Sequence, residues 1–307
     1  MSGMNEKIDI EAFFQNQLNH WKSVSENYVH LKHIQCRNID YNGFKIEIQF
    51  NPERIRSSAA NIEKKVIDER PCFLCPQNRP LEQMEIDYLG RYDLLVNPYP
   101  IFPKHLTIPD KQHLPQLIKG RIGDMLQLAK DLPDYTILYN GPKSGASAPD
   151  HFHFQAGNKG LLPIEKDVHS GSYKVKIKEN KEGSLYQMQN YLRNCFIFES
   201  KDLDWLRSEF EEYYLFQHKL QPEEDEPMFN VICWQEENVW QLVIFPRKQH
   251  RPYQYYETGI NQILLSPGVV DFGGILVVPR KEDYDKLNKD LVKDIYSQLT
   301  LNFYETT

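Results

Sequence analysis

One arrangement of strands and turns occurs twice in the 307-residue chain, and this repetition is the strongest constraint on its fold. Two strand-like runs at 92–97 and 105–109 lead into the polar connection Asp-Lys-Gln-His. Two later runs, at 228–234 and 239–245, lead into Pro-Arg-Lys-Gln-His. Similar strands and connections in two parts of one chain are typical of a duplicated architecture. We therefore expect an α+β protein of two β-rich halves, each an antiparallel sheet with packed helices.

Other segments show the periodicity of helices and strands. Apolar residues recur at the three- and four-residue spacing of amphipathic helices in four segments, 10–32, 114–132, 202–220 and 282–302. Further strands are expected at 43–50, which alternates between polar and apolar residues, and around 270–278, which is an apolar run. The chain is 40% hydrophobic and 26% charged, which is ordinary for a globular protein.

Charge and composition exclude several classes of function. A net charge of −7 argues against a nucleic-acid-binding protein that works through a general basic surface, but it leaves room for a small anion pocket. The N-terminus lacks a signal-like apolar run, and no window approaches 18 uninterrupted apolar residues. We therefore expect a cytoplasmic protein without a membrane partner. Five cysteines, an odd and sparse set, are poor evidence for disulfides.

The clearest functional pattern is the segment 150–155, Asp-His-Phe-His-Phe-Gln. On a strand, residues two apart share a face, so His151, His153 and Gln155 would project together while the phenylalanines face the core. The preceding segment 140–147 is rich in Gly and Ser and can bring backbone N–H groups against an anion. An isolated His-x-His pair is more often structural, so the flanking segments matter to the interpretation.

A second motif is the Cys-x-x-Cys segment formed by Cys72 and Cys75. Two thiolates at this spacing suit tetrahedral zinc. A thioredoxin-like redox pair is the competing chemistry, but Gln-Asn-Arg-Pro follows the motif instead of a helix-forming run. Two idle thiols are the third alternative. A zinc site would need two further ligands, and histidines downstream can supply them.

Together these motifs resemble the histidine-triad superfamily, specifically its galactose-1-phosphate uridylyltransferase branch, which also contains diadenosine tetraphosphate phosphorylases and GDP-hexose phosphorylases. The resemblance runs over about 51–279. It is carried by the Cys-x-x-Cys motif, the Gly-Ala-Ser element at 145–147 and the His-x-His-x-Gln row. Weaker support comes from Asn-Pro-Tyr-Pro at 97–100, Phe-Asn-Val at 229–231 and Phe-Pro-Arg at 245–247.

The resemblance implies a catalytic role for two residues of the row. His153 corresponds to the family nucleophile, which forms a covalent nucleotidyl-histidine and gives ping-pong kinetics. Gln155 replaces the histidine usual in hydrolytic members. Its amide cannot titrate but can donate to a phosphoryl oxygen, which favours transfer over hydrolysis.

The resemblance also implies substrate contacts and a structural zinc ion. The expected substrate-binding residues are Asn97, Ser144, Gly145, Ser147, Arg54, Arg56 and Lys143. The expected zinc ligands are Cys72, Cys75, His113 and His151, with His105 competing with His113 for the third position.

The expected organisation is an N-terminal helix and strand over 1–50, a catalytic histidine-triad-like half over 51–190 and a second half over 191–307 without the His-x-His row. The expected function is phosphorolysis of a nucleoside diphosphate sugar or a dinucleoside polyphosphate. The alternatives are a hexose-1-phosphate uridylyltransferase and a zinc-stabilised nucleotide-binding protein without turnover. The partners would be the nucleotide substrate with phosphate or a sugar phosphate, and not a nucleic acid. A homodimer is left open.

Overall fold

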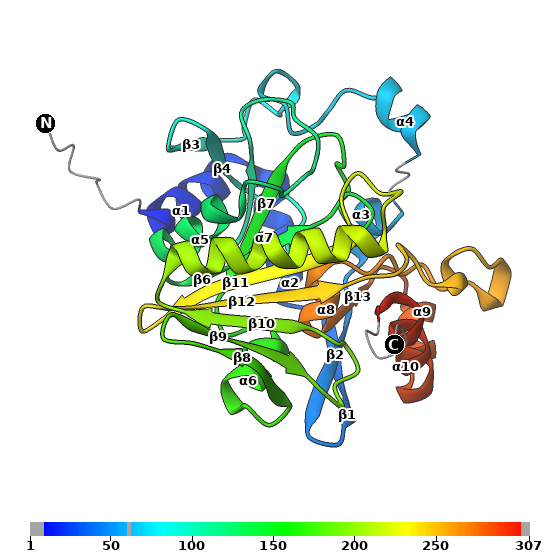
Figure 1. The fold of residues 1–307 in the computed structure, drawn as a ribbon. Coiled ribbons are helices and arrows are strands. Elements are labelled where there is room, and N and C mark those ends of the chain that lie inside the picture. The colour runs from blue at the N-terminus through cyan, green and yellow to red at the C-terminus, as the bar shows by residue number, and fades with distance from the viewer. Residues whose placement is uncertain (1–8, 60–62, 302–307) are drawn as a thin grey trace, which may run out of the picture.

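A ten-stranded antiparallel sheet runs through the whole molecule (Figure 1). The computed structural model describes residues 9–59 and 63–301. The strand order is β3-β4-β5-β7-β6-β11-β12-β10-β9-β8. The strands are β3 (Glu85–Tyr88), β4 (Tyr92–Val96), β5 (His105–Pro109), β6 (Tyr135–Asn140), β7 (His153–Asn158), β8 (Lys174–Glu179), β9 (Gly183–Met188), β10 (Phe196–Ser200), β11 (Phe229–Glu236) and β12 (Val239–Pro246).

The sheet is built from two copies of one topology. Along the chain the first copy is β3-β4-β5-α5-β6-β7 and the second is β8-β9-β10-α7-β11-β12. Read inward from either edge, the strand order is the same, and the copies join where β6 pairs with β11. The predicted α+β class with duplicated antiparallel halves is therefore confirmed.

The sequence repeat that suggested this duplication does not mark equivalent positions. Asp-Lys-Gln-His follows β5 in the first copy, whereas Arg-Lys-Gln-His directly follows β12 in the second. The counterpart of β5 is β10, not β12. The predicted equivalence is wrong because proline followed by polar residues ends strands in many places.

Helices cover one face of the sheet with a large apolar core. They are α1 (Ile10–His20), α2 (Lys22–Leu31), α5 (Ile122–Asp131) and α7 (Leu203–Leu220), and Figure 1 shows α7 lying across the central strands. Phe152 and Phe154 are fully buried in this core. The predicted helix at 10–32 is two helices, because the backbone of Trp21 leaves the helical region. The predicted helix at 114–132 starts only at Ile122, since Pro115 and Gly120 precede it.

The opposite face carries a second core and a smaller sheet. This sheet has the order β1 (Gln35–Tyr41), β2 (Phe44–Phe50) and β13 (Ile275–Val278), with β13 parallel to β2. Around it lie α6 (Pro163–Ser170), α8 (Val269–Gly273), α9 (Lys281–Lys286) and α10 (Lys289–Leu299). The strand at 43–50 is confirmed. The first half of the strand predicted at 270–278 is helix α8, and the predicted terminal helix is divided between α9 and α10.

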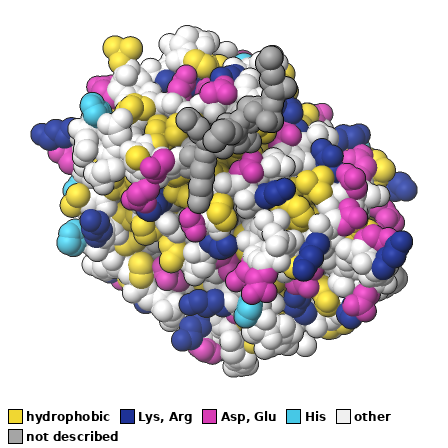
Figure 2. Space-filling view, turned by 90° about the vertical axis from the view of Figure 1, so that its left-hand side faces the viewer, with side chains coloured by type: hydrophobic (Ala, Val, Ile, Leu, Met, Phe, Trp, Pro, Cys, Tyr) yellow, Lys and Arg dark blue, Asp and Glu magenta, His cyan; other side chains and the backbone are white. Residues whose placement is uncertain are grey.

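Short helices complete the chain, and the surface shown in Figure 2 is mixed in charge. The short elements are η1 (Pro52–Arg54), α3 (Ile55–Ser58), α4 (Lys64–Glu69), η2 (Pro76–Asn78), η3 (Tyr253–Tyr255) and η4 (Gly259–Asn261). On the face in Figure 2, basic and acidic side chains are interspersed. Within the described residues, none of the helices has the length and apolar character needed to span a membrane.

At two glycines, Gly157 and Gly123, an added Cβ would clash with a neighbouring side chain, but substitution by alanine should affect stability in opposite ways. A Cβ at Gly157 would lie 2.4 Å from the ring of Phe102, which is buried, so Gly157→Ala should lower the free energy of unfolding by about 1–3 kcal/mol. A Cβ at Gly123 would lie 2.3 Å from the guanidinium of Arg207, an exposed side chain that can move away. Gly123→Ala should therefore be neutral or stabilise α5 by up to ~1 kcal/mol. Urea unfolding of both variants tests this, and equal losses would contradict it.

Candidate active site and metal centre

The four predicted metal ligands, Cys72, Cys75, His113 and His151, lie together with their ligand atoms all within 4.8 Å of one another. Sγ of Cys72 lies 3.3 Å from Nδ1 of His151, and Sγ of Cys75 lies 3.3 Å from Nδ1 of His113. The two Nδ1 atoms are 3.3 Å apart. Tetrahedral zinc with bonds of about 2.0–2.3 Å needs ligand atoms about 3.3–3.8 Å apart. The cluster could therefore hold a metal ion of this kind.

The histidine orientations fit metal binding. Nε2 of His151 lies 2.7 Å from the carbonyl oxygen of Asp110, so it carries the proton and leaves Nδ1 free as a ligand. Burial lowers the pKa of His151 and favours this neutral form. Burial also raises the pKa of the Cys72 thiol to about 12, so a thiolate here needs a cation beside it.

An ion pair links the cluster of cysteines and histidines to the glycine-serine loop. The guanidinium of Arg70 lies 2.8 Å from Oδ1 of Asp150 and 3.4 Å from the carbonyl oxygen of Ser147. Arg70 stands two residues before Cys72, and Asp150 directly precedes His151. The pair therefore connects both arms of the cluster to the loop that leads into β7.

His153 is the first residue of β7, and its ring has one defined proton position. Nδ1 donates a hydrogen bond to the carbonyl oxygen of His151 at 2.9 Å, which leaves the lone pair on Nε2. Within the described residues Nε2 has no hydrogen-bond partner. Burial lowers the pKa of His153 to about 4, so the ring is neutral at pH 7. A buried, neutral imidazole with an uncommitted Nε2 can act as a nucleophile.

The predicted strand at 150–155 is only partly correct. His151 lies in a bend before β7, and its side chain turns to the metal cluster, whereas His153 and Gln155 share one face of β7. The alternate residues Phe152 and Phe154 pack into the helix-covered core, as expected.

Gln116, which the sequence analysis missed, fixes the backbone of His153. Its Oε1 accepts from the backbone N–H of His153 at 2.7 Å, and its Nε2 donates to the carbonyl oxygens of His153 and Asn140 at 3.0 and 2.9 Å. The side chain is fully buried between β6 and β7, where the strands separate. Pro115 and Gly120 argue against a helix at this position, and this was the signal in the sequence that could have revealed the role of Gln116.

His105 does not join the metal cluster but contacts Gln155. Nε2 of His105 lies 2.9 Å from Oε1 of Gln155, and Nδ1 accepts a hydrogen bond from the backbone N–H of Ile101 at 3.2 Å. His113 therefore occupies the third position of the cluster, and His105 belongs to the row that contains Gln155.

The glycine-serine loop forms a turn with a buried, unsatisfied hydroxyl. Ser144 is fully buried, and its Oγ has no hydrogen-bond partner among the described residues. Gly145 has a φ of +99°, and a Cβ there would lie 2.6 Å from Cα of Gly268. The loop can therefore contact the start of α8 only with glycine at this position.

Residues of the second half hold this loop in place. Nδ2 of Asn230 donates to Oδ1 of Asn140 at 2.9 Å and to the carbonyl oxygen of Ser144 at 2.6 Å. The buried Arg247 donates to Oδ1 of Asn230 at 2.8 Å and to the carbonyl oxygen of Pro267 at 3.0 Å. The Phe-Asn-Val and Phe-Pro-Arg elements thus have a supporting role.

Of the other predicted substrate residues, Asn97 and Lys143 already make contacts within the protein. Asn97 donates to Oγ1 of Thr107 at 2.8 Å and accepts from the N–H of Tyr99 at 2.9 Å. Lys143 is exposed and pairs with Glu224 at 2.6 Å. Ser147 is half-buried.

The two predicted arginines, Arg54 and Arg56, lie in the neighbouring short helices η1 and α3. Arg54 donates to the carbonyl oxygen of Tyr99 at 2.8 Å. Burial lowers the pKa of its guanidinium to about 10 although nearby Asp271 raises it, so Arg54 is a cation at pH 7. Arg56 lies in α3, but its side chain is outside the described part of the structure.

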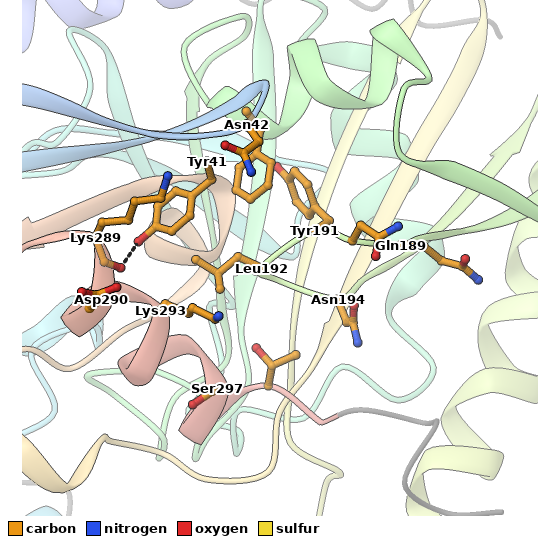
Figure 3. A pocket seen from close by; sticks show the side chains of 13 residues that line it. Tyr41, Asn42, Gln189, Tyr191, Leu192, Asn194, Lys289, Asp290, Lys293 and Ser297 are labelled. Carbon is orange, nitrogen blue, oxygen red and sulfur yellow. Dashed lines mark hydrogen bonds between the residues drawn. The ribbon is translucent and has the colours of Figure 1, made fainter.

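A separate cavity of about 970 Å³ lies between the β1–β2 hairpin, the connection from β9 to β10 and α10 (Figure 3). Tyr41 and Lys289 face each other there, with the Tyr41 hydroxyl donating to the Lys289 carbonyl oxygen at 2.5 Å. None of the catalytic, substrate-binding or metal-ligating residues predicted from the sequence lines this cavity.

Comparisons with known proteins identify similar family models and folds. Residues 13–158 match the family model "Domain of unknown function (DUF4922)", and residues 167–305 match "GDPGP1-like, C-terminal domain". No curated protein matches the chain. The crystal structure of yeast Ap4A phosphorylase Apa2 with Ap4A is similar with a TM-score of 0.62 at 17% identity, covering 93% of this chain and 97% of that one. The Apa2 complex with AMP is similar with a TM-score of 0.61 at 17% identity, covering 93% of this chain and 96% of that one.

The agreement extends over both halves of the sheet, because the match to Apa2 covers nearly all of each chain. At this identity the likeness concerns the fold. The chain therefore shares the fold of Ap4A phosphorylase Apa2, and its residues 167–305 match the GDPGP1-like C-terminal domain.

Proposed function

We propose that the protein is a nucleotidyltransferase that acts through a covalent nucleotidyl-His153 intermediate, with phosphate as acceptor. Its donor would be a nucleoside diphosphate sugar or a dinucleoside polyphosphate. The observation that carries this proposal is the ring of His153, which is buried and neutral, with its proton on Nδ1 and the Nε2 lone pair uncommitted. Support also comes from the fold shared with Ap4A phosphorylase Apa2, which binds Ap4A and AMP in its crystal structures.

The reaction would proceed in two displacements. Nε2 of His153 attacks the α-phosphorus, an N–P bond forms, and the bond to the bridging oxygen breaks with its electron pair leaving on the hexose 1-phosphate or nucleotide. An oxygen of inorganic phosphate then attacks the same phosphorus, and the N–P electron pair returns to His153. The product is a nucleoside diphosphate. Nδ1–H stays bonded to the His151 carbonyl oxygen and stabilises the positive ring of the intermediate.

Neighbouring groups would bind and shield the phosphoryl group. Gln155 offers amide N–H donors to a phosphoryl oxygen and cannot activate water by titration. The unsatisfied hydroxyl of Ser144 and the cationic Arg54 suit an anion nearby. These features favour transfer over hydrolysis.

Zinc is the metal we propose for the cluster of two cysteines and two histidines, because this donor set and its spacing fit tetrahedral coordination. Four protein ligands leave no open position, so the ion would be structural. It would hold the segment that leads into β7 and thereby the backbone of His153.

Trapping of labelled protein tests the intermediate. Incubation with donors labelled at the α-phosphate, such as Ap4A and GDP-hexoses, should give acid-labile, base-stable label on the wild type. His153→Ala should reduce labelling on the order of a thousandfold or more, since it removes the nucleophile. His169→Ala, at an exposed position of α6, is the matched control and should keep full labelling. Nucleotide binding without label on the wild type would instead indicate a binding protein without turnover.

The acceptor is tested on the same labelled protein. Inorganic phosphate should release the label as nucleoside diphosphate. Release by hexose 1-phosphate, but not by phosphate, would make the protein a uridylyltransferase-like enzyme and contradict the phosphorylase proposal.

The rate of intermediate formation should change little between about pH 5.5 and 8. Only neutral His153 has a lone pair on Nε2, so the rate falls as pH drops through its pKa. Burial places that pKa at about 4, whereas a free histidine titrates near about 6.5. Single-turnover labelling across this range checks the prediction, and a decline centred near the free value would contradict it.

Metal analysis tests the zinc assignment. Purified wild type should contain equimolar zinc, and Cys72→Ser should lose most of it because it removes one of four ligands. Cys36→Ser changes an exposed cysteine outside the cluster and should retain the metal. A wild-type protein purified without chelators and free of zinc would rule the assignment out.

A further inference from the structure

The hydrogen bonds of His105 fix which of its ring nitrogens carries the proton. The backbone N–H of Ile101 can only donate, so Nδ1 of His105, 3.2 Å away, must accept. In the neutral ring the proton is then on Nε2, which donates to its neighbour at 2.9 Å, Oε1 of Gln155. Burial, aided by the charge of Arg54, lowers the pKa of His105 to about 3, so the ring is neutral at pH 7 and the hydrogen bonds select this tautomer.

The fold holds the imidazole of His105 rigidly. His105 is fully buried and lies opposite Gly157 in the ladder between β5 and β7. Because Gly157 has no side chain, the ring of Phe102 packs there and meets the imidazole edge to face, with centroids 5.3 Å apart. Gln155 is two residues before Gly157 on the same face of β7, within reach of His105.

The contact fixes which way the amide of Gln155 points. A glutamine amide can turn by half a rotation and exchange its oxygen and nitrogen. The donor on His105 requires the oxygen, so the amino group must face away from His105. Within the described residues this amino group has no acceptor, and Gln155 is half-buried rather than enclosed. A half-buried amide whose N–H donors have no partner in the protein can donate to a phosphoryl oxygen.

We propose that His105 is a positioning residue for nucleotidyl transfer, which orients the Gln155 amide so that its amino group donates to the phosphoryl oxygen. This inference rests on the proposed function of His153 and Gln155. It adds a residue that does not touch the substrate and acts through another side chain. His105 neither ligates metal nor exchanges protons during the reaction.

The rate of intermediate formation under single-turnover conditions tests the proposal. His105→Phe keeps a ring but removes the donor, and should slow labelling by α-labelled Ap4A or GDP-hexose about 10–100-fold. The donor concentration at half-saturation should change less than about threefold, because the contact matters most as charge develops on the phosphoryl oxygen. His105→Gln, whose amide can donate at a similar place, should recover most of the rate. Unchanged zinc content and thermal unfolding in both variants would show that the fold is intact.

A double-mutant comparison separates positioning from general support. In a Gln155→Ala background, His105→Phe should cost less than about threefold, since no amide remains to be oriented. The same fold-loss in both backgrounds, or no loss in the wild-type background, would overturn the proposal.

An NMR measurement separates this inference from the proposed function. Nitrogen-15 spectra of the histidine rings should place the His105 proton on Nε2 throughout pH 6–8. A proton on Nδ1 would overturn the inference whether or not the protein turns over. Absence of label on the wild type with every donor would instead refute the proposed function.

Discussion

The candidate active site depends on the point where β6 and β7 stop pairing with each other. Their ladder ends at the pair Leu138 and Gln155, and the buried side chain of Gln116 continues the hydrogen bonding by bridging Asn140 and His153. The separation allows the glycine-serine loop to leave one strand and the bend that contains His151 to enter the other. Without Gln116 three buried backbone groups, the N–H and C=O of His153 and the C=O of Asn140, would lose this partner, at about 1–3 kcal/mol for each group left unsatisfied.

Three histidines near this point, His105, His151 and His153, have pKa values lowered by burial, but each has different hydrogen-bond partners. His151 directs one nitrogen to the Asp110 carbonyl oxygen and the other to the metal cluster. His153 directs one nitrogen to a carbonyl oxygen and keeps the other uncommitted. His105 uses both nitrogens within the protein. Burial lowers all three pKa values, so the partner, and not the charge, sets the role of each ring.

The sequence reveals residues whose side chains suit metal or phosphoryl chemistry more readily than the residues that contact them. The two cysteines and the histidine row are recognisable because metal and phosphoryl chemistry need these side chains at fixed spacing. Gln116 and His105 are ordinary in their local sequence, and their roles arise from contacts 37 and 50 residues away. Helix α8 was predicted as strand because short apolar runs fit both structures. The duplication was predicted, although the sequence repeat behind it lies at non-equivalent strands.

The two halves of the sheet have the same topology but not the same chemistry. Strand β12 is the counterpart of β7 in the second half. On the face where β7 carries His153 and Gln155, β12 carries Val243 and Phe245, which pack in the second core. A buried apolar row leaves no nucleophile there. The second half instead supplies Asn230 and Arg247, whose side chains hold the loop around Ser144 and its neighbours. The first half thus carries His153 and Gln155, whereas the second half fixes the loop that contains Ser144, and this supporting role explains the buried Arg247.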